Sequence, residues 1–527
     1  MRRLFLITGL LALALPGCIR KPAGSPGDQV LRYPISAEPS SLDPVTITDP
    51  ATIEMLQNIY EGLVQFDVNN RIVGCLADRW DVGDGGTEYT FHIRPGVRFQ
   101  NGRTLVASDV KWSFERTLRP ATKSPVAANY LAGIVGVDEV ASGKTRDLAG
   151  VTVPDPRTVR IRLKAPRGQF LGELAYNTGW VYCREAIEKA NGRIDETSSI
   201  GTGPFKLASY LHGAKVTLDR FDDYWGGRPK LTRIERPIVI DSQTAHAKFE
   251  NGEVDLCDIS INDYLNDANS PTLKDDRRLN PLPAVSYLAL GQAAQPAFRD
   301  TRVRLAFARA IDRDQIAAVA YRGVFPRADG LLPPGIPGHD PAFPRIPYDP
   351  AGAKSLLAQA GFPEGRGFPR LVLAYTQKNP ELAAAAQIIR ENLKTNLGVD
   401  VDIQERESAT FLADARAKKL PFHLNTWFAD YLDPQNFLPT LLRTGAAVNR
   451  VSYSNPRFDT LCDRADRETD PAKRIALCQQ ADRLAMSEAP LLPLVYPKSA
   501  ELVKPYVKGR EVNLMGSLPH RKTYLQR

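Results

Sequence analysis

The sequence predicts an α/β protein with more than one lobe. Its 527 residues are enough for two or three domains, and a hydrophobic share of 43% is that of an ordinary globular protein. From residue 349 onward, expected helices alternate with expected strands, which indicates βαβ units around a parallel sheet. Between about residues 63 and 190, strands and helices are mixed in the α+β manner. The two patterns indicate two kinds of lobe.

The amino-terminal half begins with a strand, predicted over residues 29–35, and a helix. Asp49 precedes Pro50, and this pair favours a helix start because aspartate caps the first turn and proline fits within it. Apolar residues follow at helical spacing as far as Leu63. The other elements expected in this half are a strand over 89–93, a helix over 109–118 and a β-hairpin over 151–163.

The carboxyl-terminal region alternates more regularly. Asp349 and Pro350 are expected to start a helix that ends at Gly361. A strand over 371–375, a helix over 380–397 and strands over 399–403 and 422–427 are expected to follow. This order predicts a parallel sheet in the second lobe.

The first residues have the order of a secretory signal. A basic start is followed by an apolar run from Leu4 to Leu15, which is too short to span a bilayer as a helix. The sequence Leu15-Pro-Gly-Cys18 resembles a bacterial lipobox, in which Cys18 is acylated. We therefore expect a signal peptide over 1–17 and a lipid-anchored tether over 18–28. A cleaved, soluble periplasmic protein is the alternative.

The formal net charge of +8 raises the question of an anionic partner. The basic residues are spread along the chain, without a block of five or six and without interleaved aromatic residues. We therefore expect a solvated basic surface and no nucleic-acid partner.

Five cysteines follow Cys18, with no C-x-x-C pair and no histidines at zinc-finger spacing. We expect no metal site and no cofactor. Cys462 and Cys478, on adjacent expected helices, are candidates for a disulfide, although the odd count leaves at least one thiol free.

Catalytic motifs are missing from the sequence. Residues 142–145 (SGKT) imitate the end of a phosphate-binding loop, but the required first glycine is replaced by Asp138, so a polar surface loop is expected. G-x-S-x-G, H-E-x-x-H and G-x-G-x-x-G do not occur, and the six histidines are scattered. These observations argue against an enzyme.

Short segments in a fixed order carry a family resemblance over nearly all of the mature chain. They include 38–44 (EPSSLDP), 58–64 (NIYEGLV), 76–80 (LADRW), 89–99 (YTFHIRPGVRF), 201–205 (GTGPF), 223–227 (DYWGG) and 427–430 (WFAD). In these segments the chain resembles the extracellular solute-binding proteins of the dipeptide- and oligopeptide-binding family.

The resemblance implies a periplasmic binding protein-like, two-lobed clamshell with an extra inserted α+β lobe. Two strands would cross between the lobes as a hinge, near residues 285 and 498. The implied divisions are 29–62, 191–285 and 499–527 for the first lobe, 63–190 for the inserted lobe and 286–498 for the second lobe.

The function implied by the resemblance is that of a monomeric substrate-binding lipoprotein of an ABC importer. It would capture peptides or peptide-like solutes at the cell surface or in the periplasm and deliver them to the permease subunits. Proteins of this fold that bind nickel chelates, haem, opines or oligosaccharides are alternatives, because fold does not fix the ligand. Two further possible functions are those of a secreted peptide hydrolase and of a receptor that binds extended segments without import.

The resemblance also suggests the ligand-binding residues. Asp430 stands where the family's W-x-x-D pattern places the carboxylate that pairs with the ligand's amino group, and the alternative is an aspartate that caps the helix near Pro434. Trp427 is expected either to wall the site or to lie in the core. Tyr130 resembles a lid-side aromatic residue of the inserted lobe.

The segment Gly201-Thr202-Gly203 has two possible roles. It could lend backbone groups to the ligand, or it could form a turn between lobes.

Overall fold

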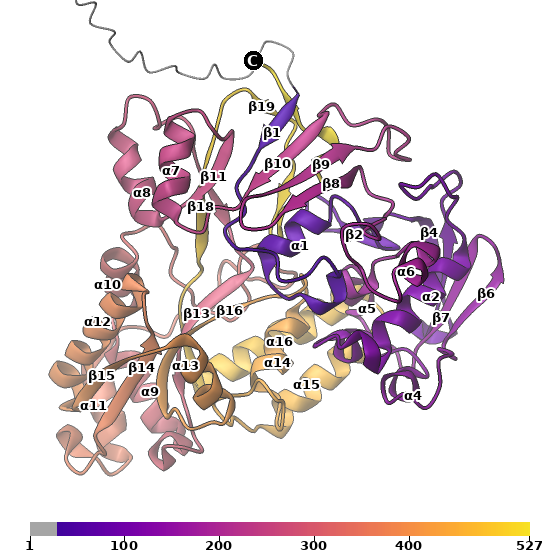
Figure 1. Ribbon diagram of the computed structural model, residues 1–527. Coiled ribbons are helices and arrows are strands. Elements are labelled where there is room, and N and C mark those ends of the chain that lie inside the picture. Colours follow the sequence, from indigo (N-terminus) through magenta and orange to yellow (C-terminus); the bar gives the residue numbers. More distant parts are fainter. Residues whose placement is uncertain (1–28) are drawn as a thin grey trace, which may run out of the picture.

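The structure is a computed structural model that describes residues 29–527. The expected signal peptide, the tether and Cys18 lie outside the described residues. The described chain forms a first lobe with two main sheets, and a second lobe and an inserted lobe with one main sheet each; the inserted lobe lies beside the first (Figure 1).

The first lobe contains two sheets. One has the order β1-β10-β9-β8, in which β1 runs parallel to β10 and the other neighbours are antiparallel. Its strands are β1 (Val30–Arg32), β8 (Phe205–Leu211), β9 (Lys215–Arg220) and β10 (Arg233–Pro237). The other sheet has the order β11-β18-β12, formed by β11 (Leu256–Ile259), β12 (Arg277–Pro281) and β18 (Lys498–Val503).

Helix α1 (Pro50–Leu56) packs Met55 and Leu56 into the core of the first lobe. Its start confirms the expected cap, because the Asp49 carboxylate accepts a hydrogen bond from the Thr52 amide at 2.8 Å. The helices α7 (Ser242–Glu250) and α8 (Ile261–Asn266) lie beside β11 and β18.

The strand expected over 29–35 is shorter in the structure. Pro34 has no amide hydrogen, so regular pairing stops at Arg32, although Tyr33 and Ile35 still donate to the carbonyl oxygens of Glu235 and Pro237.

The inserted lobe is an antiparallel sheet with the order β4-β5-β7-β6, covered by helix α2 (Ala107–Leu118). The strand expected over 89–93 is confirmed as β5, in which buried residues alternate with half-buried ones, and the hairpin is confirmed as β6 and β7. Its elements are β4 (Ala77–Gly83), β5 (Glu88–Ile93), β6 (Val151–Asp155), β7 (Thr158–Arg162), α3 (Ala127–Tyr130), α4 (Val137–Ala141), α5 (Phe170–Leu174) and α6 (Arg184–Lys189). Residues 142–145 form an exposed turn and bend, as expected.

Asp109 does not begin helix α2. Its carboxylate reaches back to the Val106 amide at 3.0 Å from the third helical position, so the helix starts at Ala107.

The second lobe has a five-stranded sheet with the order β15-β14-β16-β13-β17. Its strands are β13 (Ala284–Leu290), β14 (Leu371–Thr376), β15 (Val401–Arg406), β16 (Phe422–Phe428) and β17 (Leu491–Val495). Its helices are α9 (Thr301–Ala310), α10 (Arg313–Gln315), α11 (Pro350–Gln359), α12 (Pro380–Leu397), α13 (Ser408–Arg416), α14 (Leu438–Leu442), α15 (Pro456–Arg467) and α16 (Pro471–Glu488).

The expected parallel sheet in this lobe is only partly present. Strand β14 is parallel to β15 and β16, but β13 is antiparallel to both β16 and β17. The prediction is confirmed for the three strands that the sequence indicated, β14, β15 and β16, whereas β13 runs in the opposite direction to them. Strand β17 is antiparallel to β13 and therefore runs in the same direction as β16. The chain enters and leaves the lobe through β13 and β17. They stand outside the alternation of helices and strands on which the prediction rested.

The chain passes between the first and second lobes at two adjacent places. One crossing joins β12 to β13 through residues 282–283, and the other joins β17 to β18 through residues 496–497. The Leu282 amide donates to the Pro497 carbonyl oxygen at 3.2 Å, so the two crossings are hydrogen-bonded to each other.

The inserted lobe also contacts the second lobe. The Gly168 amide donates to the Asp466 carbonyl oxygen at 3.1 Å, and a β-carbon on Gly168 would lie 2.3 Å from Nε of Arg474. Arg474 forms two hydrogen bonds of 2.7 Å with the Asp433 carboxylate, and both side chains are buried. This ion pair therefore supports the contact between the lobes.

Cys462 and Cys478 lie buried in the core around α15 and α16, and both are free, so the suggested disulfide is absent. Within residues 29–527 no helix has the length and apolar character needed to cross a membrane. In the same part of the chain, no group of three or more histidine, cysteine or carboxylate side chains could hold a metal ion.

Candidate functional site

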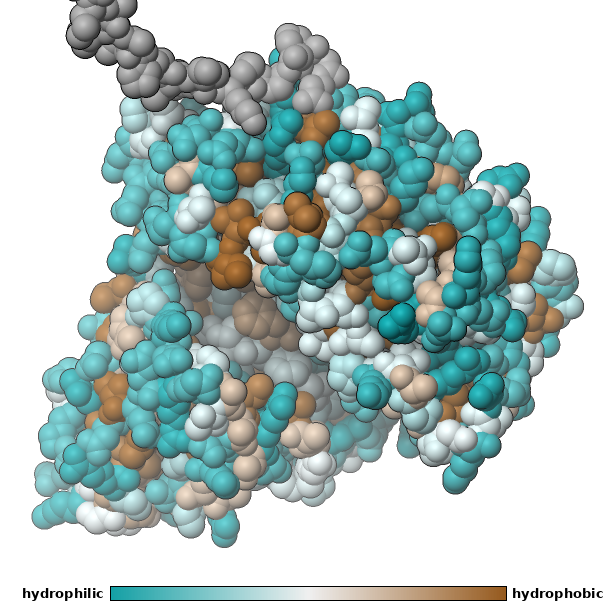
Figure 2. Space-filling view, viewed as in Figure 1, coloured by the Kyte–Doolittle hydropathy of each residue, from teal (hydrophilic) through white to brown (hydrophobic). Residues whose placement is uncertain are grey.

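A cavity of about 340 Å³ lies where the three lobes meet. The first lobe contributes α1 and the turn of the carboxyl-terminal hairpin formed by β20 (Val512–Asn513) and β21 (Gly516–Ser517). The segment 175–180 after α5 forms another wall, and the end of β16 with residues 429–430 forms the side of the second lobe. Figure 2 shows the surface hollowed between the second lobe at the lower left and the part above it, with apolar surface inside the hollow.

Large apolar side chains form much of the cavity wall. Phe428 of the second lobe and Met515 of the hairpin are 53% and 41% exposed, although such side chains are normally buried. Other apolar and aromatic members of the wall are Ile53, Tyr60, Val64, Phe66, Tyr176, Trp180 and Leu518. A volume near 300 Å³ and a mainly apolar lining are typical of sites for small molecules.

Three carboxylates line the cavity, and two of them already have partners in the protein. Glu54 forms an ion pair of 3.3 Å with the buried Arg236. Glu61 is buried and accepts hydrogen bonds from Thr202, Tyr224 and Trp225 at 2.7–2.8 Å. Burial raises the pKa of Glu61, and these hydrogen bonds oppose that effect. Glu54 and Glu61 therefore stabilise the first lobe through these contacts.

Asp430 is the third carboxylate, and its main chain is held firmly. It follows the end of β16, and its amide donates to Oδ1 of Asn436 at 3.1 Å. The Asn436 carbonyl oxygen in turn accepts from Nε1 of Trp427 at 2.8 Å. The next helical turn is capped by the Asp433 carboxylate, which accepts from the Gln435 amide. The alternative role of Asp430 as the cap near Pro434 is therefore wrong.

The Asp430 carboxylate is half-buried without a counter-ion. Among the described residues, no arginine, lysine or histidine lies within ion-pair distance of it, in contrast to Glu54. Burial raises the pKa of Asp430, while hydrogen bonds from Tyr130 and Asn436 lower it. A carboxylate of this kind attracts a cation from outside the protein, because pairing would offset the cost of burying its charge.

Tyr130 and Trp427 occupy different surroundings. Tyr130 of the inserted lobe stacks on Tyr176, with ring centroids 4.4 Å apart, and meets Tyr431 edge-on at 6.0 Å. The structure therefore brings Tyr130 together with Asp430 at the edge of the cavity. Trp427 packs against the core of the second lobe instead and is not among the residues that line the cavity.

The segment Gly201-Thr202-Gly203 lies outside the cavity. A β-carbon on Gly201 would lie 2.0 Å from the Ile59 carbonyl oxygen, and one on Gly203 would lie 2.5 Å from that of Asn58. Thr202 donates to Glu61. The close approach of two backbones accounts for the glycines, and a contact of this segment with a ligand stays a prediction.

Gly201→Ala is expected to lower the free energy of unfolding by about 2–3 kcal/mol, because the new methyl group would collide with backbone rather than with a movable side chain. Gly83→Ala is the matched control, since nothing lies within 4 Å of its added β-carbon, and its effect should stay within about 0.5 kcal/mol. Urea unfolding measures both values. Equal effects of the two substitutions would contradict this account of the turn.

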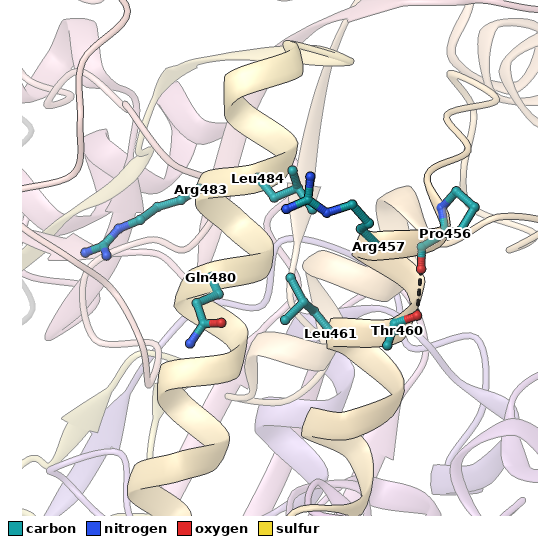
Figure 3. Close-up of a pocket in the computed structure, with 7 residues that line it drawn as sticks. All are labelled: Pro456, Arg457, Thr460, Leu461, Gln480, Arg483 and Leu484. Atoms are coloured by element: carbon teal, nitrogen blue, oxygen red, sulfur yellow. Dashed lines mark hydrogen bonds between the residues drawn. The ribbon is translucent and has the colours of Figure 1, made fainter.

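A larger hollow of about 570 Å³ lies between α15 and α16 of the second lobe (Figure 3). Leu461, Leu484 and Arg457 lie between the two helices, and Thr460 donates to the Pro456 carbonyl oxygen within α15. The hollow is open to solvent, and the described residues that line it all come from these two helices. The cavity between the lobes is the better candidate, because it is more enclosed and contains an unpaired carboxylate.

Several residues of the cavity wall were not predicted from the sequence. Phe428 could have been found, because alternation along β16 places it on the opposite face from Trp427, next to Asp430. Met515 carries no such signal, since it lies in the turn between two strands of two residues each.

These features together define a two-lobed binding protein with a cavity between its lobes. Residues 71–449 match the family described as bacterial extracellular solute-binding proteins, family 5 (middle region), and the chain belongs to this family. The dipeptide-binding protein DppE of Bacillus subtilis (strain 168) is 29% identical over 523 residues, which cover 95% of this chain and 94% of that protein.

Two solved structures show the same fold. The unliganded open form of the periplasmic murein tripeptide-binding protein MppA has a TM-score of 0.82 at 26% identity, covering 94% of this chain and 97% of that one. The periplasmic binding protein DppA of Helicobacter pylori in complex with the peptide STSA has a TM-score of 0.74 at 28% identity, covering 94% and 98%. The described chain is therefore closer to the open structure than to this peptide complex.

Proposed function

We propose that this protein captures a peptide or peptide-like solute between its lobes and delivers it to the permease subunits of an ABC importer. The unpaired Asp430 carboxylate at the cavity between the lobes carries the proposal. The names of DppE and of the DppA complex with STSA support a peptide as the ligand class.

Peptide chemistry fits this site. A free peptide has an ammonium group at one end, which needs an anion once it leaves water. Asp430 supplies that anion, and Tyr130 beside it covers the charged pair from the inserted lobe. The same requirement favours an amine-bearing ligand over haem, a nickel chelate or an oligosaccharide.

Closure of the lobes would couple binding to transport. We propose the lobe divisions expected from the sequence, with the crossings at 282–283 and 496–497 as the hinge. The resemblance to an open form supports an open unliganded state. A ligand that contacts both lobes stabilises the closed state, and the permease would recognise that shape.

The chemical outcome of this cycle is binding without turnover. Among the described residues the cavity contains no nucleophile held by a histidine, which is the arrangement that a peptide hydrolase of that type would need. The family to which the chain belongs, bacterial extracellular solute-binding proteins, supports the proposal that the ligand is released unchanged.

We also propose that the mature protein begins at an acylated Cys18 and works as a monomer tethered to a membrane surface. The lipobox-like sequence from Leu15 to Cys18 supports this anchor.

Native mass spectrometry of the protein purified from its own host tests the proposal. The expected spectrum shows a monomer that starts at Cys18 with lipid attached and carries a small solute with a free amine. X-ray scattering should show a more compact protein when the solute is added back. A ligand without an amine, a cleaved ligand, or the same shape with and without ligand would contradict the proposed function.

A further inference from the structure

The apolar part of the cavity lies beside Asp430. Phe428 is two residues from Asp430 along the chain, and Met515 stands on the wall contributed by the first lobe. In the unliganded protein about half of the surface of each of these residues is exposed. A ligand group between them would bury both, and burial of apolar surface is favourable.

The charged groups of the cavity are all of one sign. The described residues that line it include three carboxylates but no lysine, arginine or histidine. Glu54 and Glu61 already have partners, so neither needs a charge from the ligand. A negatively charged ligand group here would meet like charges and would have no cation to pair with.

The apolar wall and the negative charge of the cavity together affect which ligand group can lie next to the ammonium group. In a peptide, the carbon that carries the ammonium also carries the first side chain, so that side chain must lie within a few ångströms of Asp430. Phe428, two residues from Asp430 in the chain, offers apolar surface to this side chain, and Met515 and Trp180 line the same cavity.

We infer that the cavity selects peptides whose first residue has a bulky apolar side chain and rejects those that begin with an acidic residue. The inference rests on the proposed function, in which Asp430 binds the amino group of the ligand, and it names the substrate class of that site. Phe428 and Met515 are the residues that determine this specificity.

A series of three dipeptides tests the inference. Met-Ala, Gln-Ala and Glu-Ala have first side chains of similar length that are apolar, polar and charged in turn. Isothermal titration calorimetry at pH 7 should show Met-Ala binding about tenfold more tightly than Gln-Ala, because the methionine side chain buries more apolar surface against Phe428 and Met515. Gln-Ala should bind about tenfold more tightly than Glu-Ala, because of the like charges.

A variant that introduces a positive charge separates the specificity from the general affinity for peptides. Met515→Lys places a cation on the wall and should shift the ratio of Glu-Ala to Met-Ala affinity by about tenfold in favour of Glu-Ala. Leu211→Lys is the matched control, because Leu211 is 64% exposed at the end of β8 and lies outside the cavity. It should leave the ratio unchanged.

The possible outcomes are distinguishable. Equal affinities for the three peptides, or a preference for Glu-Ala in the wild type, would overturn the inference and leave the proposed function standing. The same ratio in Met515→Lys and in the wild type would overturn the role of this wall. Absence of binding to any peptide would overturn the proposed function and the inference with it.

Discussion

Asp430→Asn is expected to weaken the binding of an amine-bearing peptide by about a hundredfold or more, without destabilising the unliganded protein. Loss of one partner of a buried charge pair costs about 2–5 kcal/mol of binding free energy, and each 1.4 kcal/mol is about tenfold in affinity. The main-chain bond from residue 430 to Asn436 does not involve the changed side chain, so the local fold should persist.

The wild-type protein should show a pH dependence of definite sign that the variant lacks. Burial raises the pKa of Asp430 in the folded protein, so its ionised form lowers the stability of the unliganded protein. The stability that this group contributes is present below its unfolded pKa and is lost as the pH rises through the folded pKa. Asparagine does not ionise, so the variant should melt at the same temperature as the wild type or slightly higher at pH 7. Wild-type affinity for the peptide should fall as the pH falls through the pKa of Asp430.

Calorimetry with one dipeptide and thermal melting without ligand are the two measurements. Asp402→Asn serves as the control, because Asp402 is exposed in an ion pair with Arg370 on the far strand β15. It should not affect peptide binding. Wild-type affinity in Asp430→Asn would exclude the carboxylate as the ammonium partner.

Arg474→Ala is expected to cost about 3–5 kcal/mol of unfolding free energy, since it leaves the buried Asp433 carboxylate without its counter-ion. Arg370→Ala removes an arginine from an exposed pair with Asp402, and its cost should not exceed about 1 kcal/mol. Urea unfolding of the two variants provides the comparison. Arg474 also packs against Gly168, so Arg474→Ala should loosen the contact between the inserted and second lobes as well.

A double variant identifies the cause of the loss. Asp433→Asn combined with Arg474→Met removes both charges and keeps a long side chain against Gly168, and asparagine can still cap the turn at Pro434. It should recover much of the lost stability, because an uncompensated buried charge is the main penalty. A double variant as unstable as Arg474→Ala would assign the effect to packing instead.

The sequence predicted the elements that have a regular period and an end signal. Helix α12 matches its expected limits because Pro380 starts it and Gly398 lies beyond its end in the left-handed conformation. Strand β5 was predictable from strict alternation. The antiparallel direction of β13 was not, because a uniformly buried strand has no pattern that reports the direction of its neighbours.

The candidate site was predictable only in part. Asp430 was found because a family pattern coincides with the end of an expected strand. Asp433, three residues later, directly precedes Pro434 and so carries the same cap signal as Asp49 and Asp349, and in the structure it is the cap. Met515 and Trp180 reach the cavity through long-range packing, for which no local pattern exists.

The cavity joins the two ends of the chain: α1 begins at residue 50, and the carboxyl-terminal hairpin ends at residue 517. These two segments are far apart in the sequence, so the wall that carries Met515 is in place only after the hairpin has folded against the rest of the first lobe. The binding site is therefore a product of the completed fold and is not contained in any one segment of the chain.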